Sequence, residues 1–407
     1  MKSNSVALKR FIFVLFVFSI VFVNTVVSQS FTRHAEVSLL TCSSGEELYS
    51  TFGHSAIRVN DTVTGKDIVF NYGVFDFNTS HFYWKFIRGK LKYQLAIQYT
   101  DSFIRSYKSE GRSVREEMLS LDQPEKMKLI QFLRINYLPA NRYYLYDFFY
   151  NNCSSKIWDA VKKTANGDFR FDQSNYKPTS FRVMLYPSLE DMDWSRFGID
   201  ILLGTPADQI ANFEEQMFLP EYLSDNMSHT YKTKVDGSRK MLLGPSILLV
   251  PERKEKDKQA GISPLVLFYF LLTAVLLLTL LVKRSKVLDG LDYLFFSGIG
   301  LLGLLLVFMW FGTDHQAMSG NYNLLWANPL GIIFLFLVNR KKYIVKKVIM
   351  TLLGLSLFCL LIGWSLIPQH FNPAFLPLAL IMTVRLTDHI FRDRFNTSIA
   401  NKLRQIQ

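Results

Sequence analysis

The segment Tyr143–Asp159, with the sequence YYLYDFFYNNCSSKIWD, changes its character halfway along. Its aromatic run stops at two asparagines, and an amphipathic pattern follows that sets Ile157, Trp158 and Val161 against lysines. This change predicts a loop that turns into a helix, with Cys153 in the first turn. Unpaired N–H groups and the positive end of the helix dipole favour a thiolate there, and the same N–H groups could stabilise an oxyanion. The alternative is a small buried cysteine that packs as an apolar residue.

The chain of 407 residues is too long for one ordinary domain, and its apolar residues are unevenly spread. The last third consists of apolar runs broken by short charged clusters, which indicates a membrane domain. The net charge of +12 does not indicate nucleic-acid binding, because many basic residues lie in those clusters and no nucleic-acid motif accompanies them. We therefore expect an integral membrane protein with no nucleic-acid partner.

Residues 1–30 have the features of an export signal. Lys2, Lys9 and Arg10 form a positive start, Phe11–Val23 is apolar, and small residues around Ser28 offer cleavage sites. The segment is either a cleaved signal peptide or an uncleaved signal anchor. In both cases the residues that follow lie outside the cytoplasm.

Residues 31–255 have the mixed pattern of an exported α+β domain. Strands are expected at Glu36–Thr41, Ser55–Asn60, Asp67–Val74 and Arg112–Leu119. The second and third of these are joined by turn residues and predict a hairpin. Helices are expected at Pro124–Tyr137, with Asp122 as its N-cap, and at Pro206–Leu219.

Residues 256–407 are expected to form an all-α transmembrane domain behind the charged linker Glu252–Lys258. Five apolar spans are predicted, at 262–282, 291–312, 323–338, 346–367 and 373–391. Basic clusters follow the first, third and fifth spans, whereas the loops 313–322 and 368–372 contain no Lys or Arg. The positive-inside bias therefore places the exported domain outside and the C-terminal tail in the cytoplasm.

A catalytic cysteine needs a base, and the exported domain contains His34, His54, His81 and His229. His54 follows Gly53 directly before a predicted strand, where it is well placed to face a cleft. The alternative for any single histidine is a satisfied surface residue.

A histidine on a strand, a polar residue on the adjacent strand and a later cysteine at a helix start form a recognisable order. It resembles the circularly permuted papain-like domains of NlpC/P60 and lecithin:retinol acyltransferase-like thiol enzymes, in which an Asn-Cys pair opens the helix as Asn152-Cys153 does here. The whole chain is similar to the Lnb-type lipoprotein N-acyltransferases of the Gram-negative envelope. The residues that carry this resemblance are Ser38–Cys42, Phe52–Val59, Phe70–Gly73, Asn141–Tyr144, Tyr146–Phe148, Asn151–Cys153, Gly204–Asp208, Phe218–Pro220, Asn323–Trp326 and Asn328–Leu330.

The resemblance implies an inner-membrane enzyme with its catalytic domain in the periplasm. A membrane phospholipid would donate an acyl chain to Cys153, and the lipidated N-terminus of a lipoprotein would accept it from the thioester. His54 would be the base, and Asn71 would orient it unless it only forms a hydrogen bond within the hairpin. The candidates for substrate binding are Asn152, Arg142, Tyr146 and Asp147. The last three could equally hold the loop before Cys153.

Two other functions fit parts of the sequence. NlpC/P60-like domains commonly cut cell-wall peptides, which suggests a peptidoglycan amidohydrolase, but a wall enzyme needs at most a tether. A non-catalytic assembly factor or chaperone would make Cys153 and His54 structural.

We expect no metal and no cofactor, and no oligomeric state is indicated. A disulfide between Cys42 and Cys153 is possible in an oxidising compartment.

Overall fold

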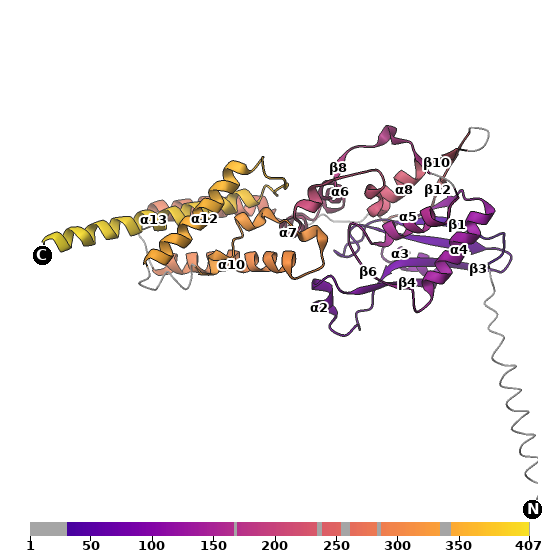
Figure 1. Ribbon diagram of the computed structural model, residues 1–407, viewed down its shortest axis with the longest axis horizontal. Helices are drawn as coiled ribbons and strands as arrows, with labels where there is room; N and C mark the ends of the chain where they lie inside the picture. The colour runs from indigo at the N-terminus through magenta and orange to yellow at the C-terminus, as the bar shows by residue number, and fades with distance from the viewer. Residues whose placement is uncertain are drawn as a thin grey trace, which may run out of the picture.

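The computed structural model describes residues 31–166, 169–233, 238–253, 261–282, 286–333 and 343–406. The predicted signal at 1–30 and most of the charged linker lie outside these residues. Figure 1 shows an elongated molecule with a sheet domain at one end, a bundle of helices at the other and the C-terminus at the far tip of the bundle.

The sheet domain is built on seven antiparallel strands in the order β12-β5-β1-β2-β3-β4-β6. These strands are β1 Glu36–Cys42, β2 His54–Asp61, β3 Lys66–Val74, β4 Lys92–Tyr99, β5 Val114–Leu119, β6 Tyr143–Leu145 and β12 Leu243–Val250. The four predicted strands are confirmed to within two residues at each end, and β2 and β3 form the predicted hairpin. The mixed helix-and-sheet character of this domain is therefore confirmed.

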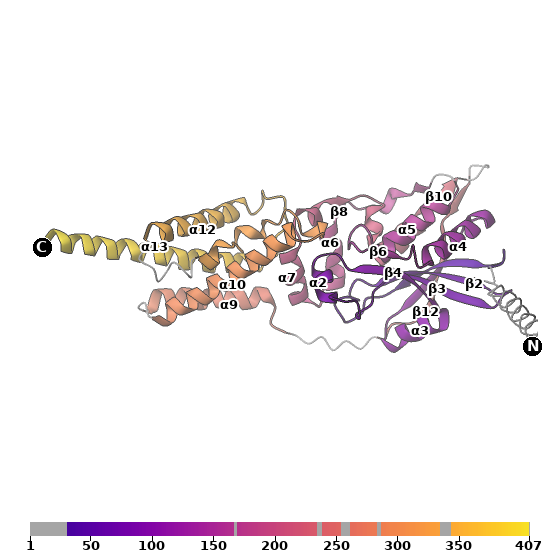
Figure 2. The same ribbon diagram turned by 60° about the horizontal axis from the view of Figure 1, so that its bottom comes forward.

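Side chains alternate between the two faces of the sheet along each strand, and each face packs against its own core. On β1, Val37 and Leu39 face a core that they share with helices α4 (Gln123–Tyr137) and α5 (Cys153–Thr164). Leu40 on the same strand faces the second core, under α3 (Thr100–Ser109). Figure 2 shows the sheet between these two layers. The predicted helix Pro124–Tyr137 is thus confirmed as α4, with Asp122 in a capping box.

The remaining elements of the exported part are short. They are α2 Phe82–Ile87, β7 Arg170–Phe171, η1 Gln173–Asn175, β8 Thr179–Ser180, α6 Phe181–Leu185, η2 Tyr186–Leu189, α7 Asp193–Leu202, η3 Thr205–Asp208, β9 Ile210–Ala211, η4 Glu215–Phe218, α8 Pro220–Ser228, β10 Thr230–Thr233 and β11 Arg239–Met241. The predicted helix Pro206–Leu219 is wrong, since two 3-10 turns and strand β9 occupy it. The chain is held extended there because β9 pairs with β8, and Asp208 is held by Arg182.

The helical domain contains α9 Pro264–Leu281, α10 Lys286–Phe311, α12 Tyr343–Gly363 and α13 Phe375–Ile406. Among the described residues, two segments are long and apolar enough to cross a membrane, Pro264–Leu281 and Leu288–Phe311. The third predicted span starts later than 323, because the turns η5 (Gln316–Met318) and η6 (Tyr322–Leu325) precede a helix that begins at residue 330 and is described up to residue 333.

A buried ion pair ties the bundle together at Arg385 of α13. The guanidinium donates to both carboxylate oxygens of Asp292 on α10, each at 2.7 Å, and to the hydroxyl of Thr279 on α9 at 2.7 Å. Asp388 lies 3.4 Å away on the same helix. A buried charge needs such partners to offset its lost hydration. Arg385 is therefore satisfied within the bundle.

Candidate active site

Helix α5 places Cys153 at its first position by means of a capping box. The Asn152 side chain accepts a hydrogen bond from the Ser155 N–H at 3.0 Å, and the Ser155 hydroxyl accepts one from the Asn152 N–H at 2.8 Å. Asn152 also donates to the carbonyl oxygens of Phe148 and Phe218, at 2.7 and 2.8 Å. These contacts engage its side-chain amide with protein and hold the residue that precedes the cysteine.

His54, at the start of β2, lies against Cys153. Its Nε2 is 2.6 Å from the side-chain oxygen of Asn71 on β3, which leaves Nδ1 as the ring nitrogen for the thiol. The thiol and the imidazole lie close enough together for each to shift the pKa of the other. The predicted trio Cys153, His54 and Asn71 is therefore gathered in one place by a helix start and two neighbouring strands.

The site favours a thiolate–imidazolium pair. Desolvation opposes charge on the Cys153 sulfur, but the charge and the hydrogen bond of His54, with a hydrogen bond from the Ser55 N–H, lower its pKa to about 7. Desolvation likewise opposes charge on His54, but Cys153 and Asn71 raise its pKa above the ordinary value. The N-terminus of α5 adds its partial positive charge beside the sulfur. Cys153 is half-buried and forms no disulfide.

A bulge in β3 brings the backbone up to the sulfur. The pairing of β3 with β4 shifts between Asn71 and Val74, and Gly73 within it has φ +89°. A Cβ at Gly73 would lie 3.5 Å from the Cys153 Cβ and 3.9 Å from His54 Cε1. Glycine is favoured here because an L side chain is strained at this φ.

Tyr144 is a site residue that the sequence did not single out. Its hydroxyl is buried and has no partner in good hydrogen-bond geometry among the described residues. A Cβ at Gly73 would lie 4.0 Å from that oxygen and 3.5 Å from the Cys153 Cβ, so the hydroxyl and the cysteine lie near the same point of β3. Burial and the nearby Cys153 raise the pKa of Tyr144 well above its usual range, so the phenol keeps its proton. Its position on β6, an edge strand paired with β4, depends on a contact distant in sequence.

The other three predicted binding residues make different kinds of contact. Tyr146 stacks on Tyr93 with ring centroids 4.3 Å apart and lies close enough to Cys153 to interact with its charge. Asp147 accepts hydrogen bonds from the N–H groups of Phe149 and Tyr150, and so holds the loop before the cysteine. Arg142 packs over the ring of Tyr143, 5.1 Å from its centroid. Tyr146 alone of these three is placed beside the sulfur.

Cys42 forms no disulfide, and Cys359 is also free. Burial raises the pKa of Cys42 to about 12, so this thiol is protonated and unreactive.

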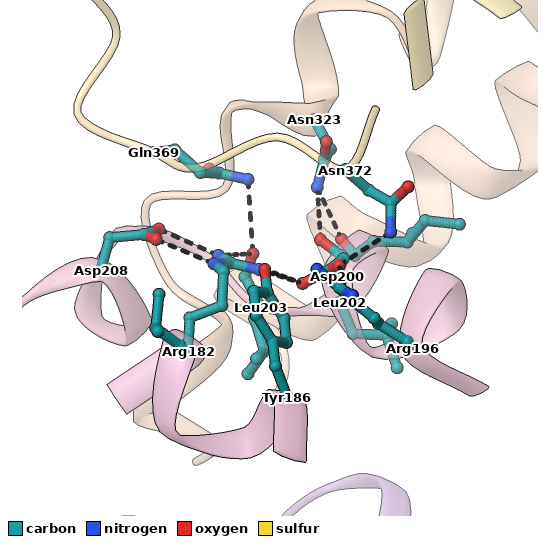
Figure 3. A network of polar contacts seen from close by, with 12 residues as sticks. Arg182, Tyr186, Arg196, Asp200, Leu202, Leu203, Asp208, Asn323, Gln369 and Asn372 are labelled. Carbon is teal, nitrogen blue, oxygen red and sulfur yellow. Dashed lines mark hydrogen bonds and ion pairs between the residues drawn. The ribbon is translucent and has the colours of Figure 1, made fainter. Parts of the chain in front are cut away.

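The sheet domain is bonded to the two loops that contain no Lys or Arg. Arg182 on α6 is fully buried and binds Asp200 at 3.0 Å and Asp208 at 2.8 Å (Figure 3). Asp200 in turn accepts hydrogen bonds from Asn323 through its carbonyl and from Asn372 through its carboxylate, at 3.0 and 2.9 Å. The network thus reaches from the exported domain into both membrane loops.

Backbone contacts complete this junction. The N–H of Gly204 donates to the Ala317 carbonyl at 2.9 Å, and a Cβ at Gly204 would lie 1.8 Å from the Ser319 oxygen. Trp326 is fully buried there and donates to Asn323, so it is a core residue of the bundle. Several motifs that carry the resemblance therefore lie at the junction and away from the cysteine.

Together these features define a class of protein, an exported α+β domain with a cysteine–histidine site that is fixed on a helical membrane domain. Two family models match the chain in the same order: the Lnb N-terminal periplasmic domain over residues 26–186 and the Lnb transmembrane domain over residues 255–394. The chain belongs to the Lnb family of lipoprotein N-acyltransferases, and it is an inner-membrane protein whose sheet domain lies in the periplasm. No curated protein and no solved structure matches it.

Proposed function

We propose that the protein transfers an acyl chain from a membrane phospholipid, through a thioester on Cys153, to the α-amine of a lipoprotein's lipidated N-terminal cysteine. The observation that carries this proposal is the gathering of Cys153, His54 and Asn71 at the start of α5, with His54 hydrogen bonded to Asn71 and a thiol pKa of about 7. An activated thiol beside a base is the combination that nucleophilic acyl transfer requires.

In the first half-reaction, the Cys153 thiolate attacks the ester carbonyl of the phospholipid. The ester C–O bond breaks, and the His54 imidazolium gives its proton to the departing oxygen of the lysophospholipid. The acyl group remains on sulfur, and His54 is left neutral.

In the second half-reaction, the neutral α-amine of the lipoprotein attacks the thioester carbonyl. His54 takes a proton from the attacking nitrogen while the C–S bond breaks. The amide product leaves, and the thiolate–imidazolium pair is restored. Asn71 is a positioning residue here, because it holds the imidazole through Nε2.

Both tetrahedral intermediates carry an oxyanion, and two donors lie near it. One is the backbone N–H of Cys153, which as the first residue of α5 has no partner within the helix. The other is the Tyr144 hydroxyl, which is buried, protonated and without a partner in good geometry among the described residues. Such donors act strongly in a site from which water is excluded.

We also infer a permuted papain-like domain over 31–255 and five membrane crossings in 256–407. The chain order of His54, Asn71 and Cys153 supports the first inference. The second is supported by the contacts of loops 313–322 and 368–372 with the periplasmic domain, through Asn321 and Asn372, because both loops must then lie on the periplasmic side. Reporters fused after Lys286 or Arg394 should read as cytoplasmic, and one after His370 as periplasmic. A periplasmic C-terminus would contradict the five crossings.

The test of the function is mass spectrometry of lipoprotein N-termini in cells whose only copy is wild type or Cys153→Ala. Wild type should give N-acylated lipoproteins and the variant none, although it still folds and inserts. With labelled phospholipid and no acceptor, the label should remain on Cys153 and be released by hydroxylamine. Full N-acylation by Cys153→Ala would contradict the catalytic role of Cys153 and favour the assembly-factor alternative. Release of cell-wall peptides without lipoprotein acylation would favour the amidohydrolase.

A further inference from the structure

Helix α2 (Phe82–Ile87) presents an unusual surface. Its sequence is FYWKFI, and none of its six residues is buried. Tyr83 is 76% exposed, Trp84 56% and Phe86 50%, and Phe77 in the preceding loop is 65% exposed. We call these four side chains the aromatic surface. A cluster of large aromatic side chains left open on one short segment marks a site of interaction.

The contacts of α2 fix its level relative to the membrane. The Trp84 ring stacks on Phe308 of α10, with centroids 6.0 Å apart. The Arg88 guanidinium donates to the Gly312 carbonyl at 3.3 Å, and the Arg88 carbonyl accepts from the Asp314 N–H at 3.0 Å. Because the apolar segment of α10 ends at Phe311, these contacts hold α2 at the periplasmic edge of the bilayer. Figure 1 shows α2 beside that end of the bundle.

The composition of α2 fits this level. Tryptophan and tyrosine gather where hydrocarbon meets headgroups, since their rings are apolar and their tips polar. Lys85 on the same helix can extend toward the headgroups while its stem stays in apolar surroundings. An aromatic surface held at this depth is in contact with lipid.

A chain of aromatic rings leads from α2 to the cysteine. Phe82 of α2 lies 5.8 Å from Phe75, Phe75 lies 5.2 Å from Tyr93, and Tyr93 lies 4.3 Å from Tyr146, measured between ring centroids. Tyr146 lies close enough to Cys153 for the charge of the sulfur to raise the pKa of the Tyr146 phenol. These ring contacts form one continuous aromatic cluster between the membrane edge and Tyr146.

We propose that the aromatic surface sits in the outer leaflet of the membrane, and that the donor phospholipid's acyl chain reaches Cys153 along Phe82, Phe75, Tyr93 and Tyr146. The inference rests on the proposed function. An ester drawn out of the bilayer exposes its acyl chain to water, and that exposure is unfavourable unless apolar side chains cover the chain. The route supplies this cover over the whole distance from α2.

The test uses the full chain in phospholipid vesicles and compares Tyr83→Ser/Phe86→Ser with Tyr99→Ser. Tyr99 is 74% exposed and lies at the opposite end of β4, so it is a matched control for loss of an exposed aromatic side chain. The readout is acylation of Cys153 by labelled vesicle phospholipid. The double variant should be slower by about tenfold or more, and the control unchanged. In vesicles with brominated acyl chains, the quenching of tryptophan fluorescence should shrink in Trp84→Phe.

A second substrate separates entry from chemistry. A water-soluble nitrophenyl ester should acylate Cys153 equally in wild type and in both variants, since it needs no route from the bilayer. If wild type is acylated by neither substrate, the proposed function itself fails. If the double variant takes phospholipid at the wild-type rate, the route is wrong although the function stands. If only transfer from the acyl-enzyme to the lipoprotein slows, the aromatic surface serves the acceptor, and the assignment to the donor is overturned.

Discussion

At the scale of single residues, the reactivity of Cys153 should follow its lowered pKa. Because the thiol pKa of about 7 lies below the ordinary value, the thiolate is the main form above pH 7 and is lost as the pH falls through that value. Alkylation by iodoacetamide should therefore rise through about pH 7. In His54→Ala the rise should move to higher pH, since desolvation then acts unopposed by the imidazolium. Peptide mass spectrometry follows the modification of Cys153 alone.

Cys42 is an internal control for this measurement. Burial raises its pKa to about 12, and it should stay unmodified over the same range in the folded protein. An alkylation profile of Cys153 that is the same in wild type and His54→Ala would contradict the proposed pair.

Tyr144→Phe should lower kcat and leave KM almost unchanged. The variant removes one hydroxyl that faces the site and keeps the ring that packs against Tyr72, with centroids 6.2 Å apart. Loss of one oxyanion donor typically costs about 100-fold or more in kcat. Tyr143→Phe on the same strand is the matched control, because Tyr143 is exposed and its hydroxyl bonds Arg142. Equal rates for Tyr144→Phe and wild type would remove Tyr144 from the mechanism.

The residues whose types match known catalytic chemistry were predictable from the sequence. A cysteine behind polar residues and a histidine before a strand are local signals, and the structure brings both to Asn71. Gly73 and Tyr144 carried no such signal. Gly73 matters through a bulge in the pairing of β3 with β4, and Tyr144 through the pairing of β6 with β4. Both depend on partners that no local pattern specifies.

At the scale of elements, the start of α5 depends on Asn152. Asn152→Ala removes the cap and leaves the carbonyl groups of Phe148 and Phe218 without their donor. The expected loss is about 2 kcal/mol of stability, seen as a lower unfolding temperature of the full protein in detergent. Activity should fall with it, because Cys153 is the next residue. An unchanged unfolding temperature with lost activity would instead restore the substrate contact first predicted for Asn152.

Helices and strands were predictable where a single sequence pattern determined the structure. Strands β1, β2 and β3 alternate clearly, and α4 has both a cap and a helical repeat. The segment Pro206–Leu219 has helical spacing too, but contacts with residues outside it determine its structure. Strand β8 pairs with β9, and Arg182 binds Asp208. Helix α2 was hidden in a long aromatic stretch because its neighbour is α10, far along the chain.

At the scale of the whole molecule, Gly204→Ala should separate the two domains. Its added Cβ would lie 1.8 Å from the Ser319 oxygen, so the backbones at the junction must move apart. Acylation of Cys153 from vesicle phospholipid should fall about tenfold or more, as for other geometric displacements of a site, while a soluble ester still reacts. Gly198→Ala on α7 is the control, because no atom lies within 4 Å of its added Cβ. Equal effects of the two variants would mean that the junction plays no part in catalysis.

The junction also gives the enzyme a fixed working height. Arg182, Asp200 and Gly204 hold the sheet domain to both loops at the periplasmic end of the bundle, so Cys153 cannot swing above the bilayer as it would on a flexible tether. Under the proposed function, a lipoprotein is then a substrate if its N-terminal cysteine can reach Cys153. The folded body of a lipoprotein need not be recognised, since only its N-terminal cysteine must arrive at that height. One enzyme of this design can serve lipoproteins with unrelated folds, provided that the linker behind each lipidated cysteine is long enough.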